Sequence, residues 1–499
     1  MILTVALAVP LLGALALAGS KRWSAMRARW FATGAAALSL LALIVAWFGF
    51  DPSGPLFQHV DEVRWVPSLG VAYRVGVDGI ALAVATMSAL LFVAAIAYPL
   101  DARSEPRQDH VQYYAWLLFL QAMSLGVFLA LDLLLFYVFF DLTLVGMYFL
   151  IGRWGHGEPQ VSALKFFLYT FAGSLALLLA IIGLYLSLDP HSFDMRVLIE
   201  RQPLAGSGLY AGLVFLALML GLAIKTPLVP LHTWLPQAHV DAPGPASAIL
   251  AGVLLKMGTY GMIRLPFAMM QDAFARYALA IAIIALVAIV YGALVALGQR
   301  NLKRRIAYTS INHMGYTVLG IAVAAAAFSD TDVARRLALT GATVEMVAHG
   351  LITGALFLIC GSFWQRTGEY DLDRYGGLAR QAPLLTGFTV LAAFASLGMP
   401  GLAGFVAEFQ IFAGTFAVYP WLAVIGVVGI LITAALFLDL LRRLFFGSRP
   451  LHLVDFPDLN RAEWGVLAVL TLGIVVIGIA PRFLLTLIEA SSAVLVGGR

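Results

Sequence analysis

The sequence is poor in cysteine and in charged residues, and each shortage excludes a class of protein. Its 499 residues include a single cysteine, Cys360, so no disulfide can form within the chain. An iron–sulfur cluster is held by about four thiolates, so the chain cannot house one. Only 12% of the residues are charged, against roughly 25% in a soluble domain. Because 62% are hydrophobic, we expect an integral membrane protein.

Long apolar runs follow one another along the whole chain. A spanning helix needs about 20 mostly apolar residues, so we predict an all-α polytopic membrane protein with about fourteen transmembrane helices. The first is not a cleaved signal, because its positive charges follow the apolar run. The segment 51–77 is the longest predicted loop. The helices are expected near 2–19, 29–50, 78–98, 113–130, 132–151, 164–187, 208–228, 242–265, 273–296, 306–327, 336–362, 383–416, 420–441 and 463–485.

Lysine and arginine are concentrated in alternate loops. The segments KRWSAMRAR, RSEPR and RNLKRR, the loop 364–382 and the stretch after helix 13 carry most of them. Loops rich in Lys and Arg face the cytoplasm, so both termini are expected on the outer side. This assignment leaves Lys225 and Lys256 as the lysines at membrane depth.

Ionisable residues inside predicted spans are the main candidates for function. Asp141 lies in the middle of helix 5, Lys225 late in helix 7 and Lys256 in the middle of helix 8. Such a group costs about 2.5–3.5 kcal/mol at the bilayer centre on insertion scales. A single Asp–Lys pair could simply fix the helix register. A whole set of such residues favours a function, because Ser, Thr or Asn would fix register at a lower cost.

Further titratable residues lie in helices 10 to 12. Glu345 and His349 are four residues apart, so they share one face of helix 11. His313 lies in helix 10 and Glu408 in helix 12. The histidines alone are weaker indications than the carboxylates, because each could be a core group with satisfied hydrogen bonds.

Helix 7 is predicted to be broken. Pro227 and Pro230 each lack an N–H, so the carbonyl four residues earlier loses its helical hydrogen bond. Freed carbonyls at membrane depth are tolerated only beside protein or water. Lys225 lies at this break, and His232 and His239 are expected in an interfacial turn after it.

Helix 12 carries a second break. The segment SLGMPGLAGF places Pro400 among glycines, two turns before Glu408. A unit of five spans reverses its orientation at each repeat, so helices 4–8 and 9–13 are predicted to be two inverted five-helix repeats. Each has one discontinuous helix, 7 or 12, as is typical of ion sites near the midplane. The expected organisation is 1–110 for an N-terminal three-helix segment, 111–268 and 269–447 for the repeats, and 448–499 for a C-terminal helix.

These groups suggest how a proton could move. A desolvated lysine releases its proton more readily, and Lys256 has no carboxylate within its own helix. Breaking a contact between Asp141 and Lys225 would alter the charge felt at Lys256. Histidines suit the intermediate relay, and Glu408 would exchange the proton on the far side.

Several motifs carry a resemblance to a known family. The runs KTPLVPLHTWLPQAHVDAPGPASAILAGVLLKMGTYGMIR, NLKRRIAYTSINHMGY, MVAHGLITGALFLICG and GLAGFVAEF resemble the antiporter-like membrane subunits of respiratory complex I. The resemblance runs from about Val77 to helix 14. VDGIALAVATMSALL, ALKFFLYTFAGS and the helix 12 glutamate are similar to the M-type (chain 4) branch. The L and N types usually carry Lys at this position, and the L type has a lateral helix for which this chain leaves no room.

The resemblance implies a proton-translocating subunit of an NADH-quinone oxidoreductase in the bacterial plasma (inner) membrane. It implies no cofactor in this chain, with NADH, FMN, iron–sulfur clusters and quinone held by other subunits. The implied partners are other membrane-arm subunits, with L and N types on either side, and the lipid bilayer, but no nucleic acid. The family's proton-transfer residues correspond to Asp141, Lys225, Lys256, His313, His349 and Glu408.

The chain departs from the family pattern at two positions. Asp141 stands where the family normally has Glu, and it is one methylene shorter, so its direct contact with Lys225 is left open. Glu345 stands where an uncharged residue is expected. It adds a carboxylate that could act on His349 or replace it as a relay.

Three other functions fit parts of the pattern. A subunit of a multisubunit cation/proton antiporter would use the same fold and lysines, and sodium dependence would favour it. A membrane subunit of a hydrogenase or ferredoxin-linked complex would differ only in its electron-transfer partners. A solute carrier would need a polar or aromatic cavity at the broken helices, where this chain has titratable groups.

Overall fold

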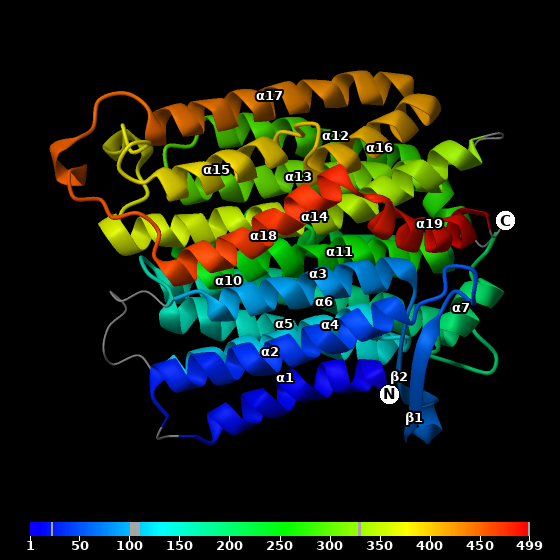
Figure 1. The fold of residues 1–499 in the computed structure, drawn as a ribbon. Helices are drawn as coiled ribbons and strands as arrows, with labels where there is room; N and C mark the ends of the chain where they lie inside the picture. The colour runs from blue at the N-terminus through cyan, green and yellow to red at the C-terminus, as the bar shows by residue number, and fades with distance from the viewer. Residues whose placement is uncertain (21–22, 100–109, 207, 328–330, 498–499) are drawn as a thin grey trace.

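A computed structural model describes residues 1–20, 23–99, 110–206, 208–327 and 331–497 of the chain. Its helices run side by side in one bundle, with both ends of the chain at the same end of that bundle (Figure 1). Of the basic segments that predicted the orientation, RSEPR and the first two residues of KRWSAMRAR lie outside the described residues.

The bundle begins with three helices, of which the second and third are separated by a β-hairpin. These elements are α1 (Ile2–Ala18), α2 (Ala25–Phe48), β1 (Gln58–Val66), β2 (Val71–Val77) and α3 (Gly79–Ala97). The next helices correspond to predicted spans 4 to 8, except for α7, which lies in the connection between spans 6 and 7. They are α4 (His110–Leu129), α5 (Leu133–Trp154), α6 (Pro159–Leu186), the short α7 (Met195–Arg201), α8 (Leu209–Lys225), α9 (Leu235–Asp241), α10 (Gly244–Ile249) and α11 (Leu255–Met262).

The remaining helices correspond to predicted spans 9 to 14 and to one further element. They are α12 (Gln271–Leu297), α13 (Leu302–Ala325), α14 (Asp332–Thr367), α15 (Pro383–Ser396), α16 (Ala403–Val418), α17 (Pro420–Phe445), α18 (Arg461–Ile479) and α19 (Arg482–Gly497). Helix 7 is thus α8 plus α9, helix 8 runs from α10 through α11 to Phe267, helix 11 is α14, and helix 12 is α15 plus α16.

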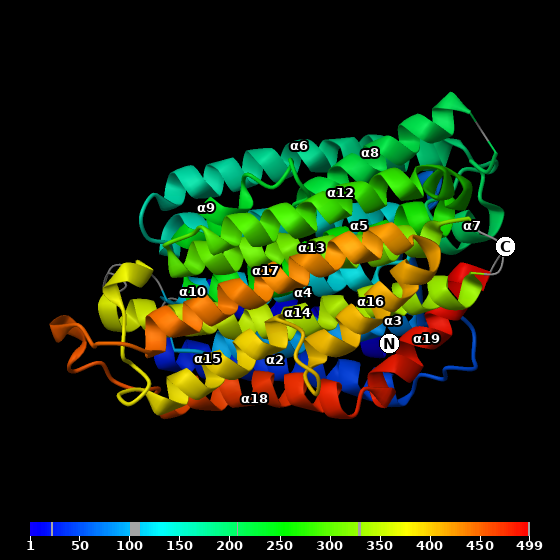
Figure 2. The same cartoon turned by 90° about the horizontal axis from the view of Figure 1, so that it is seen from above.

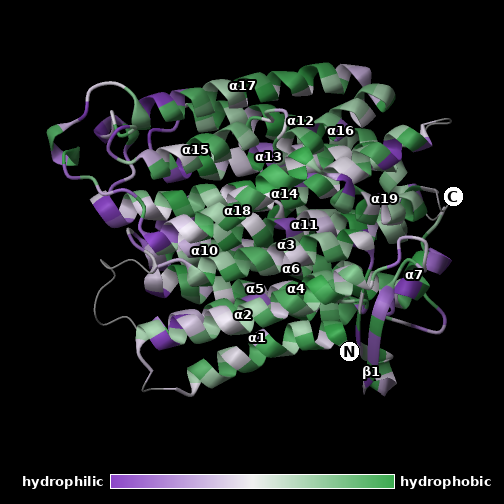
Figure 3. Cartoon of the chain, viewed as in Figure 1, coloured by the Kyte–Doolittle hydropathy of each residue, from purple (hydrophilic) through white to green (hydrophobic). Residues whose placement is uncertain are grey.

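The predicted helical membrane fold is confirmed. Among the described residues, ten helices are long and apolar enough to cross a membrane, and four shorter apolar helices accompany them. Hydrophobic residues dominate the outer helices, whereas hydrophilic segments gather at the two ends of the bundle (Figure 3). The number of fourteen spans and the two inverted repeats stay predictions.

The segment 51–77, predicted to be a loop, is largely a β-hairpin. Strands β1 and β2 pair antiparallel, and Gly70 closes the turn with a φ of +71°. Valine and Trp65 in β1 favour extended backbone. No strand was predicted in this connection, because a search for long apolar runs does not detect short, partly charged strands.

The last predicted helix, 463–485, is wrong at its C-terminal end. Helix α18 ends at Ile479, and a new helix, α19, follows Pro481. Proline lacks the N–H that would continue a helix, but it is favourable at a helix start. Helix α19 buries Leu484, Leu487 and Ile488 along one side and packs against α3 and α14. It lies at the end of the bundle that carries the chain termini (Figure 1).

Two helices form the centre of the bundle. In both helix 8 (Gly244–Phe267) and α14, the most apolar 18-residue stretch is 100% buried within the chain. Seen from the second direction, α14 again lies among the other helices (Figure 2). Charged side chains within these stretches therefore face protein and not lipid.

Candidate functional site

Helix 7 is broken where the prolines predicted it. Helix α8 ends at Lys225, and α9 begins ten residues later, at Leu235. The carbonyl of Ala223 accepts a hydrogen bond from the N–H of Leu228 at 3.0 Å. The neighbouring carbonyl of Ile224 accepts one from the indole Nε1 of Trp234, also at 3.0 Å. Protein groups therefore satisfy these carbonyls at the break.

Helix 12 is broken around its glycines, also as predicted. Gly398 and Gly401 adopt positive φ angles of +73° and +90°, which favour glycine because it has no Cβ. The side chain of Glu408 is buried and lies directly over this break. A Cβ on Gly398 would lie only 2.3 Å from Oε2 of Glu408. The glycine therefore leaves the space that the carboxylate occupies.

Lys225 turns toward α5 and not toward lipid. It is only 2% exposed, and its Nζ donates a hydrogen bond to Oγ1 of Thr143 at 3.2 Å. The same Nζ lies 4.8 Å from the ring centroid of Phe140. Asp141 stands between these two residues in α5, and its buried Oδ1 has no hydrogen-bond partner within the described chain. Among the described residues no ion pair joins Asp141 to Lys225, so the predicted pair is open.

Lys256 is fully buried in the middle of helix 8. Its Nζ donates a hydrogen bond to the carbonyl of Ala251 at 2.7 Å and lies 2.5 Å from Nδ1 of His349. Ala251 belongs to a π-helical segment, Leu250–Leu254. Such segments often occur at functional sites. When Lys256 is charged, Nδ1 of His349 must be the acceptor, because an ammonium group can only donate.

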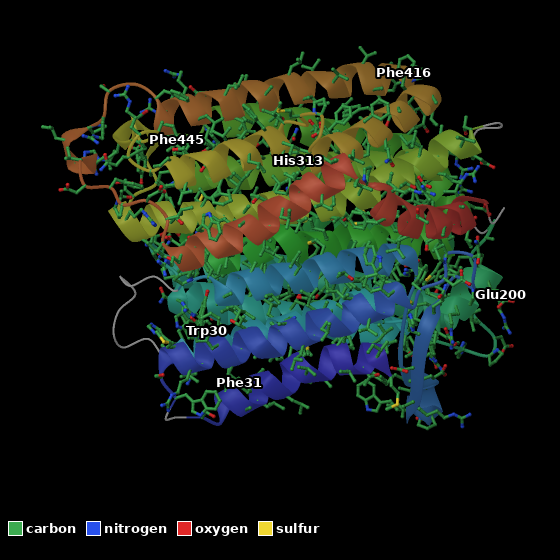
Figure 4. All side chains as sticks on the ribbon, viewed as in Figure 1. Trp30, Phe31, Glu200, His313, Phe416 and Phe445 are labelled. Atoms are coloured by element: carbon green, nitrogen blue, oxygen red, sulfur yellow. The ribbon has the colours of Figure 1, made fainter. Side chains whose placement is uncertain are left out.

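His313 extends this chain of contacts. Its Nδ1 lies 2.9 Å from Oε1 of Glu345, and its Nε2 lies 3.0 Å from Oγ of Ser396. The rings of His313 and His349 lie 5.2 Å apart between centroids. Lys256, the two histidines, Glu345 and Ser396 therefore form one buried cluster from four helices, which we call the relay cluster. The labelled side chain of His313 lies midway between the two ends of the bundle (Figure 4).

The structure thus divides the predicted site into separate parts. Four of the predicted residues belong to the relay cluster, whereas Asp141 and Lys225 lie near each other on α5 and α8. Glu408 lies at the helix 12 break, without a hydrogen bond to the relay cluster among the described contacts. For Glu345 the sequence left two roles open, an effect on His349 or a place in the relay instead of it. In the structure Glu345 pairs with His313, because α13 packs against that face of α14.

Sequence reasoning missed a second set of buried polar residues. Lys303 was placed in a cytoplasmic loop, but it is fully buried, and its Nζ donates a close hydrogen bond to the carbonyl of Ala242. His239 was expected in an interfacial turn, but it is buried in α9 and stacks on Phe357 with centroids 4.4 Å apart. Asp241 in the same helix accepts a hydrogen bond from Ser162. Lys303 lies in a run of charged residues and His239 follows a proline-rich turn, and both kinds of segment are usually exposed. Here both residues are buried because α9 packs against α13.

Comparison with known proteins places the chain in a family. Residues 130–433 match the family described as "NADH:quinone oxidoreductase/Mrp antiporter, TM". The chain belongs to this family. The match includes the six residues for which the resemblance implied proton transfer, from Asp141 to Glu408.

Family members of known name cover almost the whole chain. The chain is 36% identical over 456 residues to NADH-quinone oxidoreductase subunit M of Rickettsia prowazekii. The aligned region covers 91% of this chain and 89% of the relative. It is 37% identical over 495 residues to NAD(P)H-quinone oxidoreductase chain 4 3 of Trichormus variabilis, covering 97% and 89%. A chain of respiratory complex I from Thermus thermophilus with bound NADH superimposes with a TM-score of 0.86. It is 29% identical and covers 99% of this chain and 100% of that one.

Proposed function

We propose that this chain is a proton-translocating membrane-arm subunit of a bacterial NADH-quinone oxidoreductase. NADH oxidation and quinone reduction then occur in other subunits, which hold the FMN and the iron–sulfur clusters. The proposal is supported by relatives named subunit M and chain 4 and by the full-length likeness to a chain of complex I.

The observation that carries the proposal is the relay cluster. Lys256 and His349 are 2.5 Å apart, and His313 and Glu345 are 2.9 Å apart, all within buried helices. Ionisable side chains at membrane depth face one another and mark proton routes in many transporters. A proton on Lys256 can pass to His349, and Glu345 can stabilise a protonated His313. Both steps use the titratable groups of this chain alone.

Lys225 and Asp141 act as the switch in this proposal. Their separation leaves the positive charge of Lys225 without a direct carboxylate partner. Closing the pair would reduce the potential that Lys225 exerts at Lys256, so the affinity of Lys256 for its proton would change. The two sites are also in mechanical contact, because a Cβ on Gly258 would lie 2.2 Å from Oγ1 of Thr226. The break in helix 7 therefore packs against helix 8 within one turn of Lys256.

Glu408 receives or supplies the proton at the helix 12 break. Ser396, the last residue of α15, holds His313 from one side of this break, and Glu408 in α16 lies over it. A shift of α16 relative to α15 would therefore change the distance between Glu408 and the relay cluster.

The location and partners follow from the same proposal. The chain would lie in the plasma membrane with both termini on the outer side. Both termini lie at one end of the bundle (Figure 1). Subunits of the L and N types would flank the chain within the membrane arm.

A subunit of a cation/proton antiporter is the second candidate, because the matched family includes Mrp antiporters. A hydrogenase or ferredoxin-linked complex would also require the same membrane subunit. Purification of the native assembly, with mass spectrometry of its companions, separates these cases. Flavin and iron–sulfur subunits that oxidise NADH would support the proposal, and a complex made only of membrane subunits would support the antiporter.

Substitution of Lys256 tests the mechanism. In the purified complex in liposomes, we expect Lys256→Met to reduce NADH-driven proton pumping by about tenfold or more, because a positioned acid–base group contributes about 10²-fold or more. Lys165→Met is the matched control, since Lys165 is exposed on α6. Unchanged pumping in Lys256→Met would refute the proposed route.

A further inference from the structure

A buried ion pair lies on the same helix as Lys256, toward the end of the bundle that carries the termini. Nη2 of Arg264 lies 2.7 Å from Oδ2 of Asp78, and both side chains are at most 1% exposed. Arg264 lies in a π-helical segment, Ile263–Phe267, at the end of helix 8.

Two aromatic rings enclose the guanidinium group. Its centre lies 5.3 Å from the ring of Tyr260 and 5.0 Å from the ring of Phe57. Nε of Arg264 donates to the hydroxyl of Tyr260 at 3.1 Å, and that hydroxyl donates to the carbonyl of Phe128 at 2.8 Å. The buried Nη1 has no hydrogen-bond partner among the described residues. The group is therefore held by one carboxylate oxygen, one hydroxyl and two ring faces.

Arg264 stands directly between Lys256 and the end of the helix. Lys256, Tyr260 and Arg264 follow at intervals of four residues, so they share one helical face. A rise of 1.5 Å per residue places Arg264 about 12 Å from Lys256 along the axis. Any proton that left Lys256 along this face of helix 8 toward the terminal end would meet Tyr260 and then the ion pair.

The local charge is positive on balance. Asp78 is the N-cap residue of α3, and its Oδ1 accepts a hydrogen bond from the N–H of Ala81 at 2.8 Å. The start of a helix carries a partial positive charge. Asp78 therefore compensates two positive centres, Arg264 and the N-terminus of α3. A fixed arginine charge of this kind repels protons in water-conducting pores.

Surface elements hold the pair in position. Asp78 directly follows Val77, the last residue of β2. The N–H of Gly79 donates to Oγ of Ser491 in α19 at 2.8 Å, and a Cβ on Gly79 would lie 1.8 Å from the carbonyl oxygen of Leu487. The hairpin and α19 thus fix the start of α3 and, with it, the carboxylate of Asp78.

We propose that the Asp78–Arg264 pair seals the terminal end of the Lys256 site against protons and water. This role rests on the proposed function, because a seal matters only if Lys256 carries a transferable proton. With this exit closed, a proton on Lys256 passes sideways to His349 and not directly out along helix 8. Arg264 and Asp78 are positioning residues in this scheme, and Phe57 is the outer cover of the seal.

Passive proton conductance tests the seal. Purified complex in liposomes is given a pH gradient without NADH, and the rate of gradient decay is measured. We expect Arg264→Gln to raise the conductance severalfold and Phe57→Ala to raise it less. Arg366→Gln is the matched control, because Arg366 forms another buried ion pair, with Glu463 at 2.7 Å, near the opposite end of the bundle. It should leave the conductance unchanged.

A double variant shows whether the leak uses Lys256. We expect Arg264→Gln combined with Lys256→Met to return the conductance toward that of the unmodified complex. A leak that persists in the double variant would overturn the seal, as would an unchanged conductance in Arg264→Gln. If the complex with Arg264→Gln fails to assemble, the conductance of Phe57→Ala is the test. An unchanged conductance in Phe57→Ala would then overturn the seal. Normal NADH-driven pumping in Lys256→Met alone would instead refute the proposed function, so the two failures are distinguishable.

Discussion

Helices 7 and 12 are both interrupted, but the two breaks are built differently. In helix 7, prolines end α8, and a backbone N–H and the Trp234 indole satisfy carbonyls near the break. Lys225, at the end of α8, then reaches sideways to α5. In helix 12, Gly398 and Gly401 turn the chain with left-handed backbone. The charged residue, Glu408, lies beyond the break and covers it.

This difference determines how each charge is connected. The helix 12 break contributes Ser396 to the relay cluster and places Glu408 beside it. At the helix 7 break, Lys225 donates a hydrogen bond to Thr143, and the described residues show no ion pair between Lys225 and Asp141. The site thus has two halves. One is the relay cluster, a chain of paired titratable groups that ends at the helix 12 break. The other is Lys225 with Asp141, between which the described residues show no ion pair. In the proposed mechanism the unpaired half of the site switches and the paired half conducts.

The largest expected effect that tests this contrast comes from Glu345→Gln. The amide keeps the shape but loses the charge that stabilises a protonated His313 at 2.9 Å. We expect NADH-driven pumping in liposomes to fall by about tenfold, a barrier change of about 1.4 kcal/mol. Glu489→Gln, at an exposed position of α19, is the matched control. Normal pumping in Glu345→Gln would show that the conducting half ends at His349.

Asp141→Glu tests the switching half and should have an intermediate effect. The added methylene lets the carboxylate reach further toward Lys225, so we expect a direct ion pair in a structure of the variant. Pumping should persist, whereas Asp141→Asn, which removes the charge, should reduce it severalfold. If both variants pump equally well, the carboxylate has no part in switching.

The smallest effects come from single hydroxyl groups, one in each half. Ser396→Ala removes one hydrogen bond to His313, at a cost of about 1 kcal/mol, or roughly fivefold in an equilibrium. Thr143→Val removes the hydroxyl that holds Lys225. Because this hydrogen bond is to a charged group, its loss should cost somewhat more than the loss of the Ser396 hydroxyl, but less than the loss of a charge. We therefore expect Thr143→Val to slow pumping more than Ser396→Ala. The reverse order would mean that Lys225 is not held by Thr143 during turnover.

Features that depend on a few neighbouring residues could be predicted from the sequence. Apolar length predicted the spans, and Pro227 and Pro400 predicted the breaks, because proline and glycine act on their own turn of helix. Because burying a charge in the membrane is costly, Lys225, Lys256 and Glu408 were predicted to be functional residues. The hairpin and the boundary between α18 and α19 were not predicted, because they do not alter the apolar pattern on which the spans were assigned.

Which of these groups contact each other depends on how the helices pack, and the sequence did not predict it. Lys256 contacts a histidine 93 residues away in sequence, and Glu345 pairs with His313 on another helix. The burial of Lys303 and the Asp78–Arg264 pair likewise depend on helices far apart in the chain. The partner of a buried charge is set by the rotation and approach of neighbouring helices. A single sequence specifies each helix's apolar face but not the helix that comes to cover it.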